Sequence, residues 1–144
     1  MPLVSSADQQ HLREAFAGLV RPVRLLFFTQ TLDCETCLEA RQILDELPPL
    51  SDKIAIEEIN FVLDGDKARQ YGIDRVPAVA ILYGDDGADS RIRFLGAPSG
   101  YEFVSLVQAV LVAGGAGSQL TEENRERVAA AAGRISIQVF TTPG

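Results

Sequence analysis

The sequence lacks tryptophan and has one methionine, one histidine and only two cysteines in 144 residues. A structural zinc site needs four ligands, and His11 is the only soft candidate besides the cysteine pair. We interpret His11 as a solvated or half-buried helix residue. We therefore expect no cofactor and no metal site within one chain. A metal or cluster that four cysteines of two chains share stays open as an alternative.

Positive charge is also scarce, because 13 Lys and Arg stand against 20 Asp and Glu, which gives a formal net charge of −7. This balance argues against nucleic acid or an anionic membrane as the main partner. No apolar run approaches the ~20 residues of a membrane span, and the N-terminus lacks the basic and apolar regions of a signal peptide. We therefore expect a cytoplasmic protein that is large enough for one domain with a real core.

The two cysteines lie close together, between two different patterns. The apolar run Val23–Thr29 is typical of a central strand that is covered on both faces. A short polar loop, the motif Cys34-Glu35-Thr36-Cys37 and a helical pattern that extends to Leu47 follow it. A C-x-x-C at a strand-to-helix junction is the layout of a dithiol–disulfide redox site.

The helical period predicts different surroundings for the two sulfurs. One face of the helix is apolar and carries Cys37, Ala40, Leu44 and Leu47. Cys37 should therefore point toward the core, whereas Cys34 should be accessible at the helix tip. Free backbone N–H groups and the helix dipole favour a thiolate at that tip. We expect Cys34 to attack and Cys37 to resolve the mixed disulfide.

The rest of the chain alternates between helical and extended patterns, which indicates the α/β class. The other expected elements are a helix that Ser5 and Asp8 cap and that Arg21-Pro22 ends, a strand at Ile54–Phe61, a short helix at Asp64–Tyr71, a hairpin of Val79–Tyr83 and Arg91–Leu95, a helix capped by Ser99, a linker at Gly114–Ser118, a helix at Thr121–Ala132 and a strand at Ile135–Phe140. The first strand, the cysteine helix and the second strand form a βαβ unit, so these two strands should be parallel.

This order of elements resembles the thioredoxin fold. The resemblance depends on the C-x-x-C motif and on Gly72-Ile73-Asp74-Arg75-Val76-Pro77-Ala78 before the hairpin. It implies a central mixed sheet, built as βαβ and then ββα, with an extra N-terminal helix and a C-terminal linker helix plus strand. It also implies a cis peptide bond between Val76 and Pro77, which would lie against the cysteine pair and shape the substrate groove.

The sequence further resembles the two-unit protein disulfide oxidoreductases, over essentially all of its length. This resemblance uses the N-terminal helix, Arg21-Pro22-Val23, the segment 93–103 and the closing segment 137–143. In that family, two thioredoxin-fold units are joined in one chain. The resemblance implies a thioredoxin-like domain in residues 1–115 and, in residues 116–144, a linker helix and the first strand of a truncated second unit.

The chain departs from the family pattern in ways that affect thiol acidity. Thioredoxins carry a buried acid six residues before the first cysteine, and Phe28 occupies that position here. The cysteines are surrounded by Asp33, Glu35, Thr36 and Glu39 instead of the usual aromatic or proline residues. Nearby anions raise a thiol pKa, so we expect Glu35 to modulate the reactivity of the pair. Thr36, which also lies between the two cysteines, is the second expected modulating residue.

Two functions stay open. The first is a thiol–disulfide oxidoreductase that acts on protein disulfides or dithiols through Cys34 and Cys37, with Val76 and Pro77 at the incoming peptide. A thioredoxin-reductase-like protein is a candidate electron donor. The second is a non-catalytic thioredoxin-fold module that docks or supports a partner. The apolar strand Ile135–Phe140 should seek a sheet edge of its own domain or of a second chain, which would give a homodimer.

Overall fold

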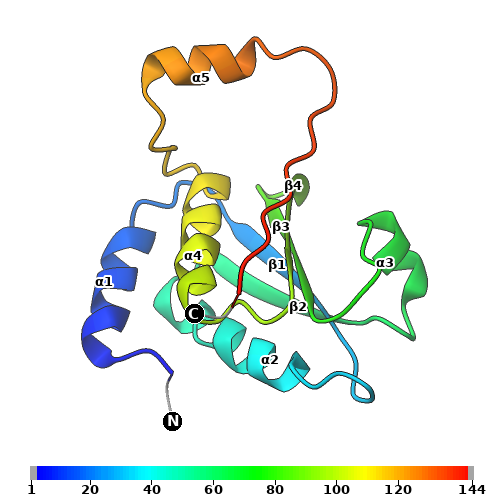
Figure 1. Ribbon diagram of the computed structural model, residues 1–144. Coiled ribbons are helices and arrows are strands. Elements are labelled where there is room, and N and C mark those ends of the chain that lie inside the picture. Colours follow the sequence, from blue (N-terminus) through cyan, green and yellow to red (C-terminus); the bar gives the residue numbers. More distant parts are fainter. Residues whose placement is uncertain (1–2, 143–144) are drawn as a thin grey trace.

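The computed structural model describes residues 3–142 of the chain (Figure 1). Its elements in order are α1 (Ser6–Phe16), β1 (Val23–Thr29), α2 (Cys37–Asp45), the 3-10 helix η1 (Pro48–Leu50), β2 (Ile54–Asn60), α3 (Gly65–Gln70), β3 (Ala78–Tyr83), β4 (Ala88–Leu95), α4 (Tyr101–Ala113) and α5 (Glu122–Ala129). Within this part of the chain, none of the helices has both the length and the apolar character that crossing a bilayer requires.

Four strands form one mixed sheet in the order β2-β1-β3-β4. β1 runs parallel to β2, with Val23 opposite Ile54, and antiparallel to β3, with Val23 opposite Tyr83. β3 and β4 form an antiparallel hairpin. The expected βαβ and ββα halves are therefore confirmed, and β1 lies in the middle because its apolar residues can be buried on both faces.

Successive residues of β1 contribute to two separate cores. Leu25 and Phe27 pack with residues of α1, α2 and α4, whereas Leu26 and Phe28 pack with residues around α3. Figure 1 accordingly shows α1, α2 and α4 on one side of the sheet and α3 on the other. Since side chains alternate across a strand, β1 holds both layers together.

The ends of the helices differ from the expectations at two points. The Ser5 hydroxyl caps α1 as expected, since it accepts the Asp8 backbone N–H at 3.2 Å, but α1 ends at Phe16. Ser99 was expected to cap α4, and this is wrong. The residue before α4 is Gly100, which has no side chain to cap with, and the Ser99 carbonyl instead accepts the Glu102 N–H.

Strand β4 begins at Ala88, earlier than the expected Arg91, because the hairpin contains a bulge. Ala80 pairs with Arg93 and Leu82 with Asp89, so β4 has two extra residues at this point. Arg91 takes a left-handed conformation there, with φ of 66°. Bulges of this kind bend a strand and increase its twist.

The end of α4 is tied to the segment that leads into β1. The Gly114 carbonyl accepts the backbone N–H groups of Val20 and Arg21, at 2.9 and 3.2 Å. The Arg21 Nε donates to the Ala113 carbonyl at 2.7 Å, and its guanidinium lies over the ring of Tyr83. These contacts satisfy carbonyl groups that a helix leaves free at its C-terminus.

The expected strand at Ile135–Phe140 does not form within this chain: the segment has no regular structure, and its side chains are exposed. The expected helix after the linker does form as α5, but it buries no residue. Figure 1 shows α5 standing away from the sheet and the following segment returning past β4 toward the start of α4. A strand needs a partner for its backbone groups, and the segment pairs with neither edge strand, β2 nor β4.

Candidate active site

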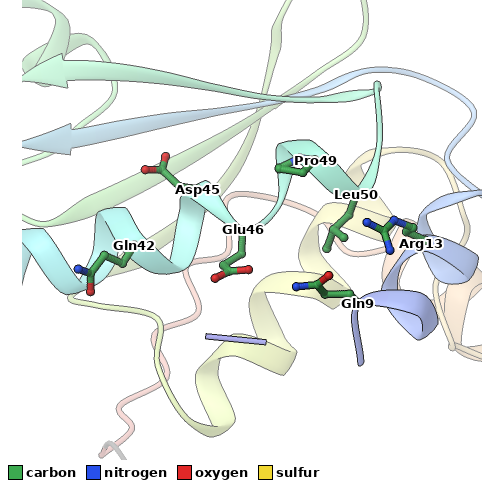
Figure 2. Close-up of a pocket in the computed structure, with 7 residues that line it drawn as sticks. All are labelled: Gln9, Arg13, Gln42, Asp45, Glu46, Pro49 and Leu50. Carbon is green, nitrogen blue, oxygen red and sulfur yellow. The ribbon is translucent and has the colours of Figure 1, made fainter. Parts of the chain in front are cut away.

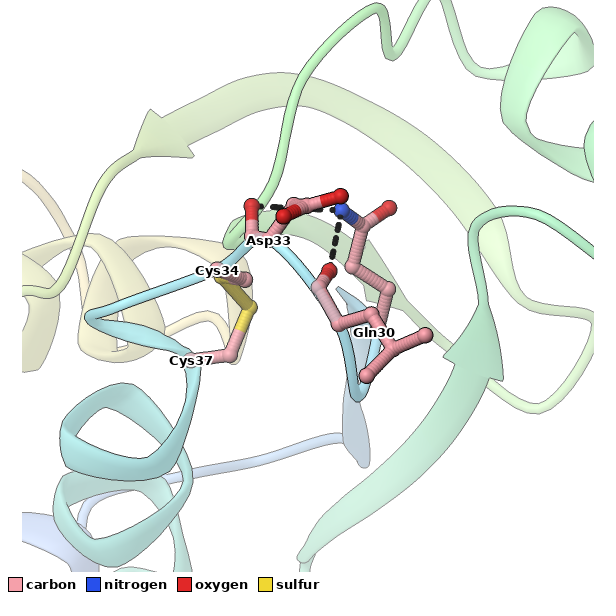
Figure 3. The surroundings of a disulfide bond; sticks show 5 residues. Gln30, Asp33, Cys34 and Cys37 are labelled. Carbon is pink, nitrogen blue, oxygen red and sulfur yellow. Dashed lines mark hydrogen bonds between the residues drawn. A yellow bond between two sulfur atoms is a disulfide. The ribbon is translucent and has the colours of Figure 1, made fainter.

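The cysteine pair lies at the carboxyl end of the central strand. β1 ends at Thr29, and a loop leads through Cys34 to Cys37, the first residue of α2. The two cysteines form a disulfide, with Cα atoms 5.5 Å apart (Figure 3). This separation lies within the usual range for disulfides.

The two sulfur-bearing residues differ in exposure. Cys37 is 5% exposed, whereas Cys34 is partly exposed. The rest of the apolar face predicted for this helix is buried as well, at Ala40, Ile43 and Leu44 of α2 and at Leu47 just beyond its end. This asymmetry agrees with the helical period in the sequence, while the chemical roles of the two thiols stay predictions.

Cys34 lies before α2, near the helix tip as expected, whereas Cys37, which was expected one turn into the helix, is its first residue. Thr36 is the N-cap residue of α2, and its side chain makes no capping hydrogen bond. Thr36 and Glu35 are both exposed between the cysteines.

A glutamine that the sequence analysis did not single out holds the loop before Cys34. The Gln30 side-chain amide donates to the carbonyl of Leu32 at 2.7 Å and, less closely, to that of Asp33 at 3.4 Å (Figure 3). Asp33 has a φ of 55°, a left-handed conformation that aspartate tolerates better than most residues. Gln30 thus fixes the turn from which Cys34 projects.

A pocket of about 260 Å³ opens beside the disulfide. Its lining residues come from the β1 end, the loop, α2 and β2: Thr29, Gln30, Thr31, Cys34, Cys37, Leu38, Arg41, Glu58 and Asn60. Arg41 and Glu58 form an ion pair across it, with Nη2 and Oε2 3.1 Å apart. Sequence reasoning missed this pair, because it depends on how α2 packs over β2.

Val76 and Pro77 lie at the same end of the sheet as the cysteine loop, where β1 ends and β3 begins. Ala78, the first residue of β3, pairs with Phe28, the residue before the end of β1. The Val76–Pro77 peptide bond is cis, Pro77 is buried, and Val76 is partly buried. Neither of them lines the cysteine pocket. Phe28 is fully buried with its ring 6.4 Å from that of Tyr71.

A second pocket, of about 290 Å³, lies between α1, the end of α2 and η1 (Figure 2). It is lined by Gln9, Arg13, Gln42, Asp45, Glu46, Pro49 and Leu50 and contains neither cysteine. Within residues 3–142, no three His, Cys, Asp or Glu side chains gather as a metal site would require. In the described part of the chain, the disulfide is therefore the candidate reactive group.

The sequence matches no protein-family model. It is 36% identical over 75 residues to a protein named probable thioredoxin from Methanothermobacter thermautotrophicus, and the match covers 51% of this chain and 80% of the relative. This chain belongs to the thioredoxin family. The shared family and the Cys34–Cys37 disulfide make it a thiol–disulfide oxidoreductase.

Two solved structures extend the thioredoxin likeness to most of the chain. The NTD_N/C domain of the alkylhydroperoxide reductase AhpF from Enterococcus faecalis has a TM-score of 0.78 at 34% identity, covering 87% of this chain and 59% of that one. A protein disulfide oxidoreductase from Aeropyrum pernix has a TM-score of 0.74 at 25% identity, covering 90% and 56%. This chain thus spans less than two thirds of either structure.

Proposed function

We propose that the chain exchanges disulfides with protein substrates, with Cys34 as the attacking and Cys37 as the resolving cysteine. The supporting observation is the difference in exposure, since only a thiol that reaches solvent can meet a substrate sulfur. In the reducing direction, the Cys34 thiolate attacks a substrate disulfide and releases one substrate thiolate. Cys37 then attacks the Cys34 sulfur, releases the second thiolate and closes the Cys34–Cys37 disulfide.

The surroundings of Cys34 suggest how a substrate is received and how reactivity is set. Val76 and Pro77 begin β3 next to the end of β1, so they form the proposed edge of the substrate groove. Glu35 and Thr36 are exposed between the cysteines and are the proposed modulating residues. If Glu35 opposes the thiolate, Glu35→Gln should lower the pKa of Cys34 and speed its alkylation, and added salt should shrink the difference.

The proposed electron donor is a thioredoxin-reductase-like protein. The likeness to a domain of an alkylhydroperoxide reductase supports this class of partner. The cytoplasmic location expected from the sequence stays a prediction.

The proposed domain organisation is a thioredoxin-like domain in residues 1–115 and a joining segment in residues 116–144. The structural matches cover 87% and 90% of the chain, more than residues 1–115 alone could supply. Exposed apolar side chains at Ile135, Ile137, Val139 and Phe140 support pairing of this segment with a sheet edge of a second chain. Light scattering on the full chain and on a version ending at Gly133 tests the proposed homodimer, because only the full chain should dimerise.

An insulin-reduction assay with dithiothreitol as donor tests the function. The wild-type chain should accelerate reduction, Cys34→Ser should abolish the effect, and Cys37→Ser should accumulate a mixed disulfide on Cys34. Limited alkylation of the reduced chain should label Cys34 first. Faster labelling of Cys37 would contradict the roles, and a wild-type chain without activity would favour the non-catalytic docking module.

A further inference from the structure

The pocket beside the disulfide contains a cation that the exchange reaction described above does not use. Arg41 follows Cys37 by four residues on α2, and side chains at this spacing are neighbours, with Cβ atoms about 5–6 Å apart. Arg41 and both cysteines line the same pocket. Besides its 3.1 Å contact with Glu58, its Nε lies 3.9 Å from Asp45 Oδ2. Carboxylates on β2 and α2 thus hold the guanidinium at the pocket wall.

The other charged groups around the cysteines are acidic or lie outside the pocket lining. The acids on the loop and on α2 are exposed: Asp33, Glu35 and Glu39. In the loop before Val76, Arg75 Nε lies 2.9 Å from Asp74 Oδ1, and neither residue lines the pocket. Glu58 is bound to Arg41 and its side chain is 43% exposed. Arg41 is therefore the positive charge of the pocket lining, in a region that is otherwise acidic.

We propose that Arg41 stabilises the Cys37 thiolate in the resolution step. The inference rests on the proposed function. A thiol that must attack from a position only 5% exposed needs help to lose its proton. Phe28, which stands where thioredoxins carry a buried acid, is apolar and fully buried and can accept no proton. A cation reaches the same result by another route, because it favours the charged form of the sulfur.

The step balances without any added reactant. The Cys37 thiol gives its proton to water in the pocket, and its sulfur attacks the Cys34 sulfur of the mixed disulfide. The bond between Cys34 and the substrate sulfur breaks, and the substrate leaves as a thiolate that takes up a proton from solvent. Arg41 acts on the charge that exists on Cys37 before the attack and disappears once the disulfide has formed.

The test is Arg41→Gln in the full chain. In a Cys34→Ser background, where Cys37 is the only thiol, ultraviolet absorbance against pH follows thiolate formation. The Cys37 pKa should rise, and the thiolate fraction at neutral pH should fall. The fall should reach about 3- to 10-fold if charge and sulfur are about as far apart as Cβ atoms at this helical spacing, about 6 Å, with an effective dielectric constant of about 40–80. With both cysteines present, decay of the mixed disulfide should slow by a similar factor, and its formation should change less.

Two variants separate charge from structure. Arg41→Lys keeps the charge and should restore most of the thiolate fraction. Arg125→Gln removes an equal charge from α5, which stands apart from α2 in Figure 1, and should change nothing. Salt should reduce the effect of Arg41→Gln. A Cys37 titration that Arg41→Gln leaves unchanged, or that Arg41→Lys alters equally, would overturn the proposal. The titration needs no substrate, so a wild-type chain without turnover would refute only the proposed function.

Discussion

Helices α1 and α5 begin in the same way and end in different circumstances. Their N-cap residues, Ser5 and Thr121, both have φ of −64° and ψ of 158°, and each side chain accepts a backbone N–H three residues later. α1 nevertheless buries Phe16 in the domain core, whereas α5 buries no residue. Capping is a local interaction that needs no surrounding structure, but packing requires a surface to pack against.

The same contrast holds for the two apolar extended segments. β1 lies between β2 and β3 and buries Leu25, Leu26, Phe27 and Phe28 almost completely. The segment 135–140 has a comparable apolar pattern, yet Ile137 is 82% exposed and Phe140 is 90% exposed. We therefore expect the side chains of residues 3–114 to contribute to the free energy of unfolding and those of the later segment to contribute little. The variants below test this difference.

The largest difference should come from removing apolar side chains in the two regions. Leu44 is completely buried, so Leu44→Ala should lower the free energy of unfolding by about 2–5 kcal/mol. Ile137→Ala should change it by less than about 0.5 kcal/mol. Urea titrations of both variants measure this. If Ile137→Ala lowered the free energy of unfolding by more than about 1 kcal/mol, the tail (the described residues after Gly114) would have to pack against the domain.

A second pair of variants tests the tie at the end of α4. A Cβ on Gly114 would overlap Leu19 Cδ2 and lie 3.2 Å from Val23 Cγ2, so Gly114→Ala should cost about 1–3 kcal/mol. Gly18 has only an ordinary contact at 3.4 Å, and Gly18→Ala should leave stability unchanged or raise it by about 0.4–1 kcal/mol. Equal thermal shifts for the two variants would show that the close approach relaxes.

A third comparison removes the same kind of cap from each helix. Ser5→Ala should lower the free energy of unfolding by about 0.5–2 kcal/mol, because α1 is packed on the domain. Thr121→Ala should leave that free energy unchanged and reduce only the helicity of α5. Urea titration reports the first quantity and NMR chemical shifts of α5 report the second. If Thr121→Ala lowered global stability, α5 would have to contact the domain in solution.

The smallest expected effect concerns a contact between the tail and the domain. Burial raises the pKa of Glu102, and a hydrogen bond with Thr141 opposes this rise. Thr141→Val should therefore raise the pKa of Glu102 further. The pKa of Glu102 is higher in the folded than in the unfolded state, so the folded state binds its proton more readily. The contribution of Glu102 to stability should therefore increase as the pH falls through the folded-state pKa. In the variant this increase should begin at a higher pH.

NMR titration of the Glu102 carboxyl measures this shift. Thr142→Val, which alters the neighbouring exposed residue, is the matched control and should leave the titration as it is. Identical titrations of wild-type and Thr141→Val protein would mean that the tail leaves α4 in solution.

Features with a repeated pattern could be predicted from the sequence, and features that depend on one distant contact could not. The period of α2 placed Cys37 inward, and the βαβ spacing gave parallel β1 and β2. The Arg41–Glu58 pair could not be foreseen, because it depends on how α2 packs over β2. The hydrogen bond from the Gln30 side chain to the Leu32 carbonyl was missed, because a single residue at the end of a strand shows no repeated pattern in the sequence.

The strand predicted at Ile135–Phe140 does not form within this chain, although its sequence pattern is clear. Its alternation is a local signal for a strand, but a strand forms only where another strand supplies hydrogen bonds. Nothing in six residues of sequence states whether such a partner is available.

The hydrogen bonds from Val20 and Arg21 to the Gly114 carbonyl give the tail a fixed anchor. Gly115 and Ala116 also donate to carbonyls of α4. A flexible tether over residues 117–120 would have a root-mean-square length of about 11 Å, so the start of α5 stays close to the end of α4. Tethering of this kind corresponds to millimolar effective concentrations. A contact worth only about 4 kcal/mol would then occupy its site about half of the time. Because of this anchor, residues 135–140 could occupy even a weak binding site for a substantial fraction of the time.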